Sequence, residues 1–321
     1  MPLAFITGAT GQDGTYLTEL LHEAGYDVHG LVRPGDPGPL HPEQIELHEG
    51  DVTDRDHLSQ LLRELAPTEI YNLAGVSSVA ACWKEPVLAA EVNGAAAVFL
   101  MEEAWRLQEA TGERVSFVQA SSAEIFGQAT QSPQSESTPI APVNPYGASK
   151  AFAHLSAGVY RARGLHASSV ILYNHESPLR PPSFVTRKIT QGAAAIAKGE
   201  AAELRLGNLD ARRDWGWAPD YVRAMHLAAV HGTAADYVIG TGVAHSVREF
   251  VEAAFTAAGV VDWQQYVVVD PAFYRPVEAH ELRADPSRAA SSLGWNPTCS
   301  FTELVARMVA VDLGQREHPV P

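Results

Sequence analysis

Cysteine, long apolar runs and positive charge are all scarce in this sequence. Its two cysteines, Cys82 and Cys299, allow one disulfide at most, and neither lies in a Cys-x-x-Cys or Cys/His cluster. A disulfide-rich scaffold and a structural zinc site are therefore not expected. The 23 Lys and Arg residues face 38 Asp and Glu, giving a net charge of −15, which argues against binding to nucleic acid.

Membrane and export signals are lacking as well. No apolar run reaches the roughly 18 residues that a membrane span requires. The start, MPLAFITGAT, has no basic region and too short an apolar run for a signal peptide. The 13 histidines show no His-x-x-x-His or similar spacing, so no metal site is predicted. We expect a soluble, cytoplasmic protein with free thiols, no membrane partner and no bound metal.

What the first half does contain is a regular alternation of short apolar runs and amphipathic segments. Right-handed βαβ units produce such an alternation. The expected fold class is therefore α/β, with a Rossmann-type doubly wound parallel sheet. The strands are expected at 3–7, 27–32, 45–50, 69–74, 114–120 and 167–173, and the helices at 16–25, 55–65, 86–112 and 145–163.

The pattern changes after Tyr173, where NHESPLRPPSF is rich in proline and polar residues and is expected to be largely irregular. We assign residues 1–175, together with part of 210–245, to a dinucleotide-binding domain. Residues 176–321 are assigned to a smaller, interleaved, mixed α/β substrate domain. Its elements are expected as helices near 184–198 and 218–230, a strand at 203–207, a strand at 237–242 that returns to the parallel sheet, and two helices behind the capping boxes Ser246/Glu249 and Ser300/Glu303.

A glycine-rich loop, TGATGQDG, joins the first expected strand to the first helix. Gly8, Gly11 and Gly14 let the backbone turn tightly and approach a pyrophosphate at the helix N-terminus. A glycine triplet alone is weak evidence, but its place in the first βα unit predicts dinucleotide binding. The predicted cofactor contacts around this loop and the next strand ends are Gly8, Thr10, Gly11, Gln12, Asp13, Gly14, Asp51, Val52, Leu73 and Ala74.

The choice of cofactor depends on the end of the second strand. An acidic residue there would favour NAD, whereas GLVRPGD offers Arg33, which suits the 2′-phosphate of NADP. Asp36 follows closely, so NAD stays open. Asp51 is expected near the adenine edge, and Asp54 caps the next helix.

The catalytic pattern is Tyr146-x-x-x-Lys150 in NPYGASK. At positions i and i+4 the two side chains share a helix face, so the ammonium is expected to lower the phenol pKa. Tyr146 would then act as acid or base in an alcohol–ketone interconversion, and Lys150 would also contact the cofactor. A solvated helix face is the ordinary reading of this motif alone.

Further blocks carry a resemblance along nearly the whole chain. They are ITGATGQDGTYL, EIYNLAG, QASSAEIFG, NHESP, FVTRKIT, GNLDARRDWG, DYVRAM, SVREFVE and YRPVE. Together with the motifs above, they resemble the extended short-chain dehydrogenases/reductases that modify nucleotide sugars, and among these the GDP-mannose 4,6-dehydratases.

The resemblance implies a redox-neutral reaction. Tyr146 would deprotonate the sugar 4-OH while hydride passes from C4 to the nicotinamide, and Ser122 would support the 4-oxygen. Glu124 would remove the C5 proton, water would leave from C6, and the hydride would return to C6. A base separate from the tyrosine is chemically sensible. Related epimerases and decarboxylases also carry a glutamate there.

The resemblance also implies the substrate contacts, and it shows where this chain departs from the family. The implied contacts to sugar, diphosphate, ribose and guanine are Ser77, Asn174, Glu176, Lys188, Arg213, Arg275 and Glu278. The departures are Val76, Ser78, Ala123, Leu179, Pro181 and a shortened loop after the second strand. That loop helps to build a tetramer in the family, so homodimer and homotetramer both stay open. A 4-epimerase, a 5,6-dehydratase, a 4-keto reductase and a non-catalytic offshoot remain alternatives.

Overall fold

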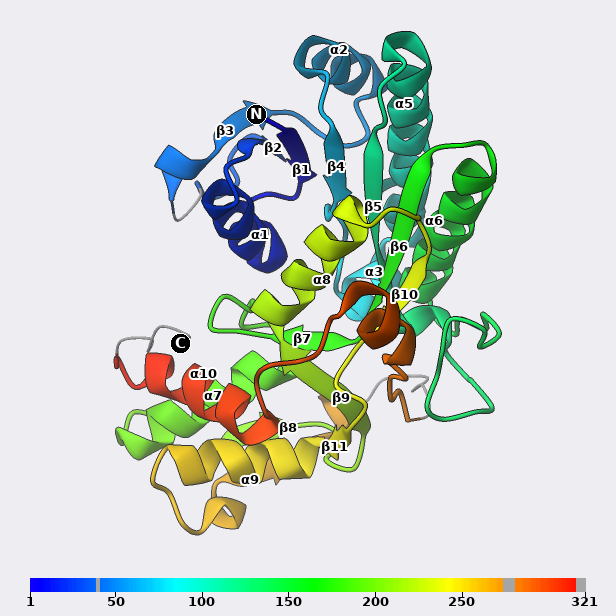
Figure 1. The fold of residues 1–321 in the computed structure, drawn as a ribbon. Coiled ribbons are helices and arrows are strands. Elements are labelled where there is room, and N and C mark those ends of the chain that lie inside the picture. Colours follow the sequence, from blue (N-terminus) through cyan, green and yellow to red (C-terminus); the bar gives the residue numbers. More distant parts are fainter. Residues whose placement is uncertain (39–40, 274–280, 316–321) are drawn as a thin grey trace.

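A seven-stranded parallel sheet organises the computed structural model, which describes residues 1–38, 41–273 and 281–315 (Figure 1). Its strands run in the order β10-β6-β5-β4-β1-β2-β3, so the chain reverses direction across the sheet between β1 and β4. Ligands of doubly wound folds bind at such a switch point. The predicted fold class is confirmed. The strands are β1 (Leu3–Thr7), β2 (Asp27–Val32), β3 (Glu46–Glu49), β4 (Glu69–Asn72), β5 (Ser116–Ser122), β6 (His166–Leu172) and β10 (Asp236–Ile239).

Helices cover both faces of this sheet, because parallel strands are apolar on both sides. One face packs on α1 (Gln12–Glu23) and α8 (Ala218–Val230), and the other on α2 (Arg55–Leu65), α5 (Ala96–Thr111) and α6 (Pro145–Ala162). Figure 1 shows α8 crossing in front of the sheet toward the lower layer. Asp54 caps α2 by accepting a hydrogen bond from the His57 amide, as predicted.

The rest of the chain forms a second, smaller layer with its own core. The two small sheets have the strand orders β11-β9-β7 and β12-β8, and Trp215, Trp217 and Phe250 lie in the apolar core between them and the helices. Its elements are β7 (Asn174–Glu176), α7 (Val185–Ala197), β8 (Leu204–Leu206), β9 (Arg212–Trp217), β11 (Ala244–Ser246), α9 (Val247–Ala257), β12 (Val267–Val269) and α10 (Phe301–Asp312).

Most expected elements are confirmed, and the differences concern one helix, several short strands and one capping box. The stretch 86–112 is not one helix: a π-helical turn at Glu91–Ala95 separates α4 (Pro86–Ala90) from α5, and a short α3 (Val79–Lys84) precedes it. The segment after Tyr173 is largely irregular, as expected, apart from the short strand β7, which pairs with β9. The strands β9, β11 and β12 were not predicted. The box at Ser246/Glu249 is complete, whereas at Ser300 only the bond from the Glu303 amide to the serine hydroxyl is present.

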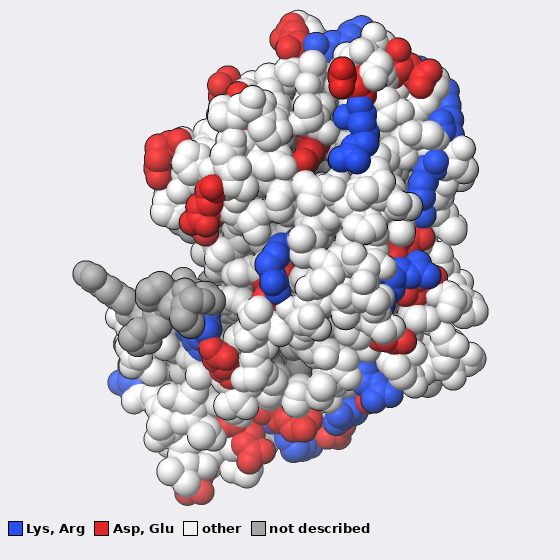
Figure 2. All heavy atoms as spheres, viewed as in Figure 1, with Lys and Arg blue, Asp and Glu red and all other residues white. Residues whose placement is uncertain are grey.

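The surface carries charges of both signs. On the face seen in Figure 2, basic side chains are interspersed with acidic ones and do not gather into one basic surface. Within the described ranges, none of the helices combines the length and apolar character needed to cross a bilayer.

Candidate active site

The glycine loop after β1 makes a close backbone cradle at the start of α1. Gly8 has a φ of +73°, and a Cβ there would lie 2.9 Å from the Ala74 nitrogen. A Cβ on Gly14 would lie 2.4 Å from the Gly8 carbonyl oxygen. No side chain caps the first turn of α1, whose N-cap is Gly11, so its amides point outward. These residues fit the pyrophosphate of a dinucleotide.

A cavity of about 550 Å³ opens beside this loop, between the large sheet and the second layer. Polar groups from both layers face it. Ser121 is one of them, and its buried hydroxyl has no hydrogen-bond partner among the residues that the structure describes. A buried orphan hydroxyl in a cavity wall suits a bound polar ligand. Of the sequence-predicted site residues, the cavity is lined by Asp13, Leu73, Ser77, Ser122, Glu124, Tyr146, Lys150, Asn174, Glu176, Lys188 and Arg213.

Tyr146 and Ser122 meet in this cavity from two different elements. Tyr146 lies in the first turn of α6 and Ser122 ends β5, so strand and helix together bring the phenol and the hydroxyl into hydrogen-bonding contact. Burial raises the pKa of Tyr146 to about 12, although the bond with Ser122 acts in the opposite direction. The phenol is therefore protonated at neutral pH in this state.

Lys150 does not lower the phenol pKa in the way the sequence suggested. Its ammonium donates to the carbonyl oxygen of Ala120 at 2.9 Å and lies 6.0 Å from the centre of the Tyr146 ring. Burial lowers the pKa of Lys150 itself to about 8. The helix spacing is as predicted, but burial raises the pKa of Tyr146 and the ammonium of Lys150 is directed at the carbonyl oxygen of Ala120.

Glu124 is held from the start of α6. The Asn144 side chain donates to a Glu124 carboxylate oxygen at 2.8 Å, and its own oxygen caps α6 by accepting from the Gly147 amide at 2.8 Å. Glu124 follows β5 in a short 3₁₀ turn, where the Ser122 hydroxyl accepts from its amide. The Glu124 carboxylate and the Tyr146 phenol therefore line the same cavity, and each is held by a different hydrogen-bond partner, Asn144 and Ser122 respectively.

The predicted adenosine side of the cofactor lies outside this cavity. Arg33, just after β2, forms an ion pair with Asp36, with 3.0 Å between the guanidinium and the carboxylate. Asp51, just after β3, accepts from the amide and hydroxyl of Thr53, and these bonds lower the pKa of Asp51. Gln12 of the glycine loop contacts the substrate side instead. Its side chain accepts a hydrogen bond from the Ser177 hydroxyl and donates one to the His175 carbonyl, in the segment after β6.

The predicted substrate residues come from the second layer. Asn174, Lys188 and Arg213 line the cavity. Glu176 lines it too, but its carboxylate accepts from the Thr186 hydroxyl at 2.6 Å and pairs with Arg180 at 3.2 Å. This buried carboxylate is therefore already engaged by the protein. The two remaining predictions, Arg275 and Glu278, lie outside the described residues.

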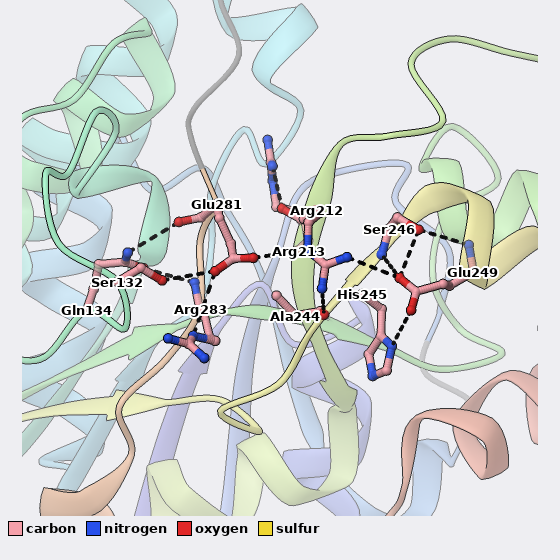
Figure 3. A network of polar contacts seen from close by, with 10 residues as sticks. All are labelled: Ser132, Gln134, Arg212, Arg213, Ala244, His245, Ser246, Glu249, Glu281 and Arg283. Atoms are coloured by element: carbon pink, nitrogen blue, oxygen red, sulfur yellow. Dashed lines mark hydrogen bonds and ion pairs between the residues drawn. The ribbon is translucent and has the colours of Figure 1, made fainter.

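The adjacent arginines Arg212 and Arg213 on β9 face opposite sides of the strand, because successive strand side chains point to opposite faces. Arg213 is 8% exposed and lines the cavity. Arg212 points the other way and pairs with Glu249 of α9 and with Glu281, as Figure 3 shows. Arg212 thus connects β9 to α9 and to the segment at 281 through ion pairs, on the side of the strand opposite to Arg213.

Sequence reasoning missed the two basic cavity residues in the segment after β6, His175 and Arg180. His175 places Nε2 2.8 Å from an Asp13 carboxylate oxygen and Nδ1 2.8 Å from the Tyr173 carbonyl oxygen. Because both partners are acceptors, both ring nitrogens must carry protons. Burial alone would lower the pKa of His175, but Asp13 raises it. Arg180 lies against the Phe184 ring and also lines the cavity. The polar segment NHES, which directly follows a predicted strand, contains His175 and could have indicated it as a site residue.

Three of the departures from the family pattern, Val76, Ser78 and Ala123, lie directly beside predicted site residues in the sequence. The amide and carbonyl of Val76 both bond to the Asn93 side chain in the π-helical turn. The Ser78 hydroxyl caps α3, and Ala123, next to Glu124 in the 3₁₀ turn, is 3% exposed; both residues line the cavity.

Comparison with known proteins agrees with this geometry. A family model described as GDP-mannose 4,6 dehydratase matches residues 5–308. The chain belongs to the GDP-mannose 4,6-dehydratase family. GDP-mannose 4,6 dehydratase 1 of Arabidopsis thaliana is 42% identical, covering 97% of this chain and 90% of the relative. GDP-mannose 4,6 dehydratase of Homo sapiens is 40% identical, covering 97% and 91%.

The fold is also similar to solved structures outside this family. A UDP-glucose 4-epimerase from Thermus thermophilus, in complex with NAD, superposes with a TM-score of 0.85 at 26% identity. The match covers 97% of this chain and 99% of the epimerase. The same fold is therefore found in an enzyme that catalyses a different reaction. The residues of the site, and not the fold, must be used to tell a dehydratase from an epimerase.

Proposed function

We propose that this chain is a GDP-mannose 4,6-dehydratase that forms GDP-4-keto-6-deoxymannose with NADP, or with NAD as the alternative cofactor. The observation that carries the proposal is Glu124, a carboxylate separate from Tyr146 on the same cavity. Dehydration needs this second base, because the phenol is already committed to the sugar 4-OH. Relatives at 42% and 40% identity bear this name. Arg33 supports the preference for NADP.

The proposed roles follow from the geometry. Tyr146, once deprotonated, takes the proton of the sugar 4-OH, and Ser122 donates a hydrogen bond to the same oxygen. The nicotinamide supplies reversible hydride transfer when bound. Glu124 removes the C5 proton, which the 4-keto group has made acidic, and passing this proton to the departing C6 hydroxyl releases water. When hydride is returned to C6, the proton held by Tyr146, which exchanges with solvent, is returned to C5 and completes the 4-keto-6-deoxy product. Lys150 and the glycine loop hold the cofactor, and Asp13 and His175 link that loop to the sugar-facing segment.

Lys188 and Arg213 are proposed to bind the diphosphate. Both are basic, both line the cavity, and they come from α7 and β9 on the substrate side. Charge-assisted hydrogen bonds from guanidinium and ammonium groups suit phosphate oxygens. The sites of Arg275 and Glu278 are proposed for the nucleoside on the family resemblance alone.

The enzyme is further proposed to work in the cytoplasm as a homodimer, with a homotetramer as the alternative. Large apolar side chains on α4 and α6 support association: Val87, Leu88, Phe152, Leu155 and Val159 are exposed, at 69%, 41%, 53%, 57% and 66%. Exposed apolar residues gathered on neighbouring helices are typical of interfaces.

The proposal is tested with a panel of nucleotide sugars and NADP⁺, reading products by mass spectrometry and NMR. We expect GDP-mannose to lose one water with no net change in reduced cofactor. If GDP-mannose stays unconverted while another nucleotide sugar is transformed, the substrate assignment is wrong. A sibling reaction is the second candidate, favoured by Val76 and Ala123, which stand where the family pattern has polar residues and of which Ala123 lines the cavity. A 4-keto reductase would consume NADPH stoichiometrically.

A further inference from the structure

Three metal-ligating side chains lie together on β2 and β3, at the edge of the large sheet, and none of them lines the active-site cavity. In the parallel pairing of these strands His29 is opposite Glu46, and His48 is two residues further along β3. Residues i and i+2 of a strand share a face, so all three point to the same side of the sheet. Their ligand atoms all lie within 4.8 Å of one another.

The two imidazoles are oriented as a pair. His29 Nδ1 lies 2.9 Å from His48 Nε2, and the rings stack with centroids 5.2 Å apart. On the other side of His29, Nε2 lies 3.5 Å from a carboxylate oxygen of Asp27. A proton on Nε2 directed at Asp27 leaves the Nδ1 lone pair facing His48. Proteins use this carboxylate–histidine arrangement to orient imidazoles that bind metals.

The spacing suits one small ion between the rings. Two nitrogens bound to a tetrahedral zinc ion, each at about 2.0–2.1 Å, lie about 3.3 Å apart. The rings would need to separate by only a few tenths of an ångström from their present 2.9 Å. Glu46 is exposed, so solvent and ions can reach the pair, whereas His29 is 6% exposed.

A third imidazole is near the pair, since His57 interacts electrostatically with His48. His57, on α2, has a buried Nε2 with no hydrogen-bond partner within the described part of the chain.

We propose that His29, Glu46 and His48 bind one divalent transition-metal ion, Zn²⁺ by the donor set, with water as the remaining ligand. The ion would join the edge strand β3 to β2. These strands lead to Arg33 and Asp51, the predicted contacts to the adenosine half of the cofactor. In the absence of an ion the two histidines are hydrogen-bonded to each other.

The test uses the full-length, tag-free, metal-stripped protein, titrated with ZnCl₂ by calorimetry and followed by thermal unfolding. We expect one ion per chain and a Tm that rises with ZnCl₂, because an ion that binds only the folded state stabilises it. CoCl₂ should give the intense visible absorption of tetrahedral Co²⁺. Glu46→Gln and His48→Gln should each weaken Zn²⁺ binding at least tenfold, whereas the exposed His22→Gln control should bind as the parent does.

Two further readouts keep the outcome clear. The metal-free Tm and the NADP⁺ affinity of His48→Gln show whether the variant is folded, and Glu46→Gln, at an exposed position, provides a second variant if His48→Gln is not. Absence of saturable Zn²⁺ binding to the parent overturns the proposal. Binding that both substitutions leave unchanged also overturns it, because the ion would then be held elsewhere.

Discussion

Asn144 connects Glu124 to the helix that carries Tyr146. Its amide nitrogen donates to the Glu124 carboxylate at 2.8 Å, while its oxygen accepts from the Gly147 amide at 2.8 Å. One side chain therefore orients the proposed C5 base and caps α6 at the turn that holds the proposed C4 base. The relative placement of the two bases depends on this residue.

Substitutions at Asn144 should show how much each of its two hydrogen bonds contributes, the one to Glu124 and the one that caps α6. Asn144→Ser keeps an N-cap acceptor but loses the donor to Glu124, so kcat should fall roughly 10- to 100-fold with nearly parental Tm. Asn144→Ala loses the cap too and should cost about 1 kcal/mol of stability in addition. Steady-state kinetics and thermal unfolding measure both effects. A parental kcat in Asn144→Ser would show that the contact does not orient the base.

Glu124→Gln should abolish dehydration and spare binding. The amide keeps the shape and still accepts from Asn144, but it cannot take the C5 proton, so kcat should fall by about 10²–10⁴. In D₂O the parent should place solvent deuterium at C5 of the product, measured by NMR. Affinity for NADP⁺ is the control and should not change. Undiminished turnover would make the base assignment wrong.

Lys150→Met should stabilise the protein while inactivating it. Burial lowers the pKa of Lys150 to about 8, so the unfolded state binds more protons above that pH. The cost of burying the charge is full below pH 8 and disappears as pH rises toward the ordinary lysine value near 10.4. The variant should therefore gain about 3 kcal/mol at most below pH 8, and little above pH 10.5.

Chemical denaturation at several pH values checks this stability prediction. The carbonyl of Ala120 keeps a second donor, the Gln119 side chain, so the loss of the lysine leaves no orphaned acceptor. A variant less stable than the parent at pH 7 would mean that the lysine contacts outweigh its desolvation.

Cofactor preference should respond to Arg33 and Asp36 in opposite directions. Arg33 pairs with Asp36 at 3.0 Å, so a 2′-phosphate has to compete with this carboxylate. Asp36→Ala should raise the affinity for NADP⁺ relative to NAD⁺. Arg33→Ala should lower that ratio about 10- to 100-fold, the range for a hydrogen bond to a charged group. Fluorescence titrations with both cofactors measure it, and an unchanged ratio in Arg33→Ala would assign the phosphate to other residues.

Leu155→Glu should dissociate the proposed dimer. Leu155 is 57% exposed on α6, beside Phe152 and Val159, and a buried charge at an interface is costly. Light scattering after gel filtration should show monomer. The matched control is Val261→Glu, at an 88% exposed position away from these helices, which should leave the assembly intact. If Leu155→Glu elutes as the parent does, α6 is not the interface.

Local patterns predicted much of the fold. The ranges 27–32, 55–65 and 218–230 coincide with β2, α2 and α8, because period and caps are properties of the local chain. The three-residue strands β7 and β11 were not predicted. Each is too short for a periodic signal, and both exist because they pair with β9. The Asp13–His175 pair and the histidines of β2 and β3 likewise depend on partners distant along the chain.

By itself, the sequence determined the βαβ order and the glycine loop, because both are patterns of neighbouring residues. It also determined which residue types face the cavity, since most of them lie in short motifs such as Tyr146-x-x-x-Lys150. Tertiary structure alone decided which charges are paired and which are buried. It directed Lys150 to a strand carbonyl, raised the pKa of Tyr146, and placed Asn144 on Glu124. The physical reason is that desolvation and hydrogen-bond geometry depend on packing between distant segments, which no linear spacing contains.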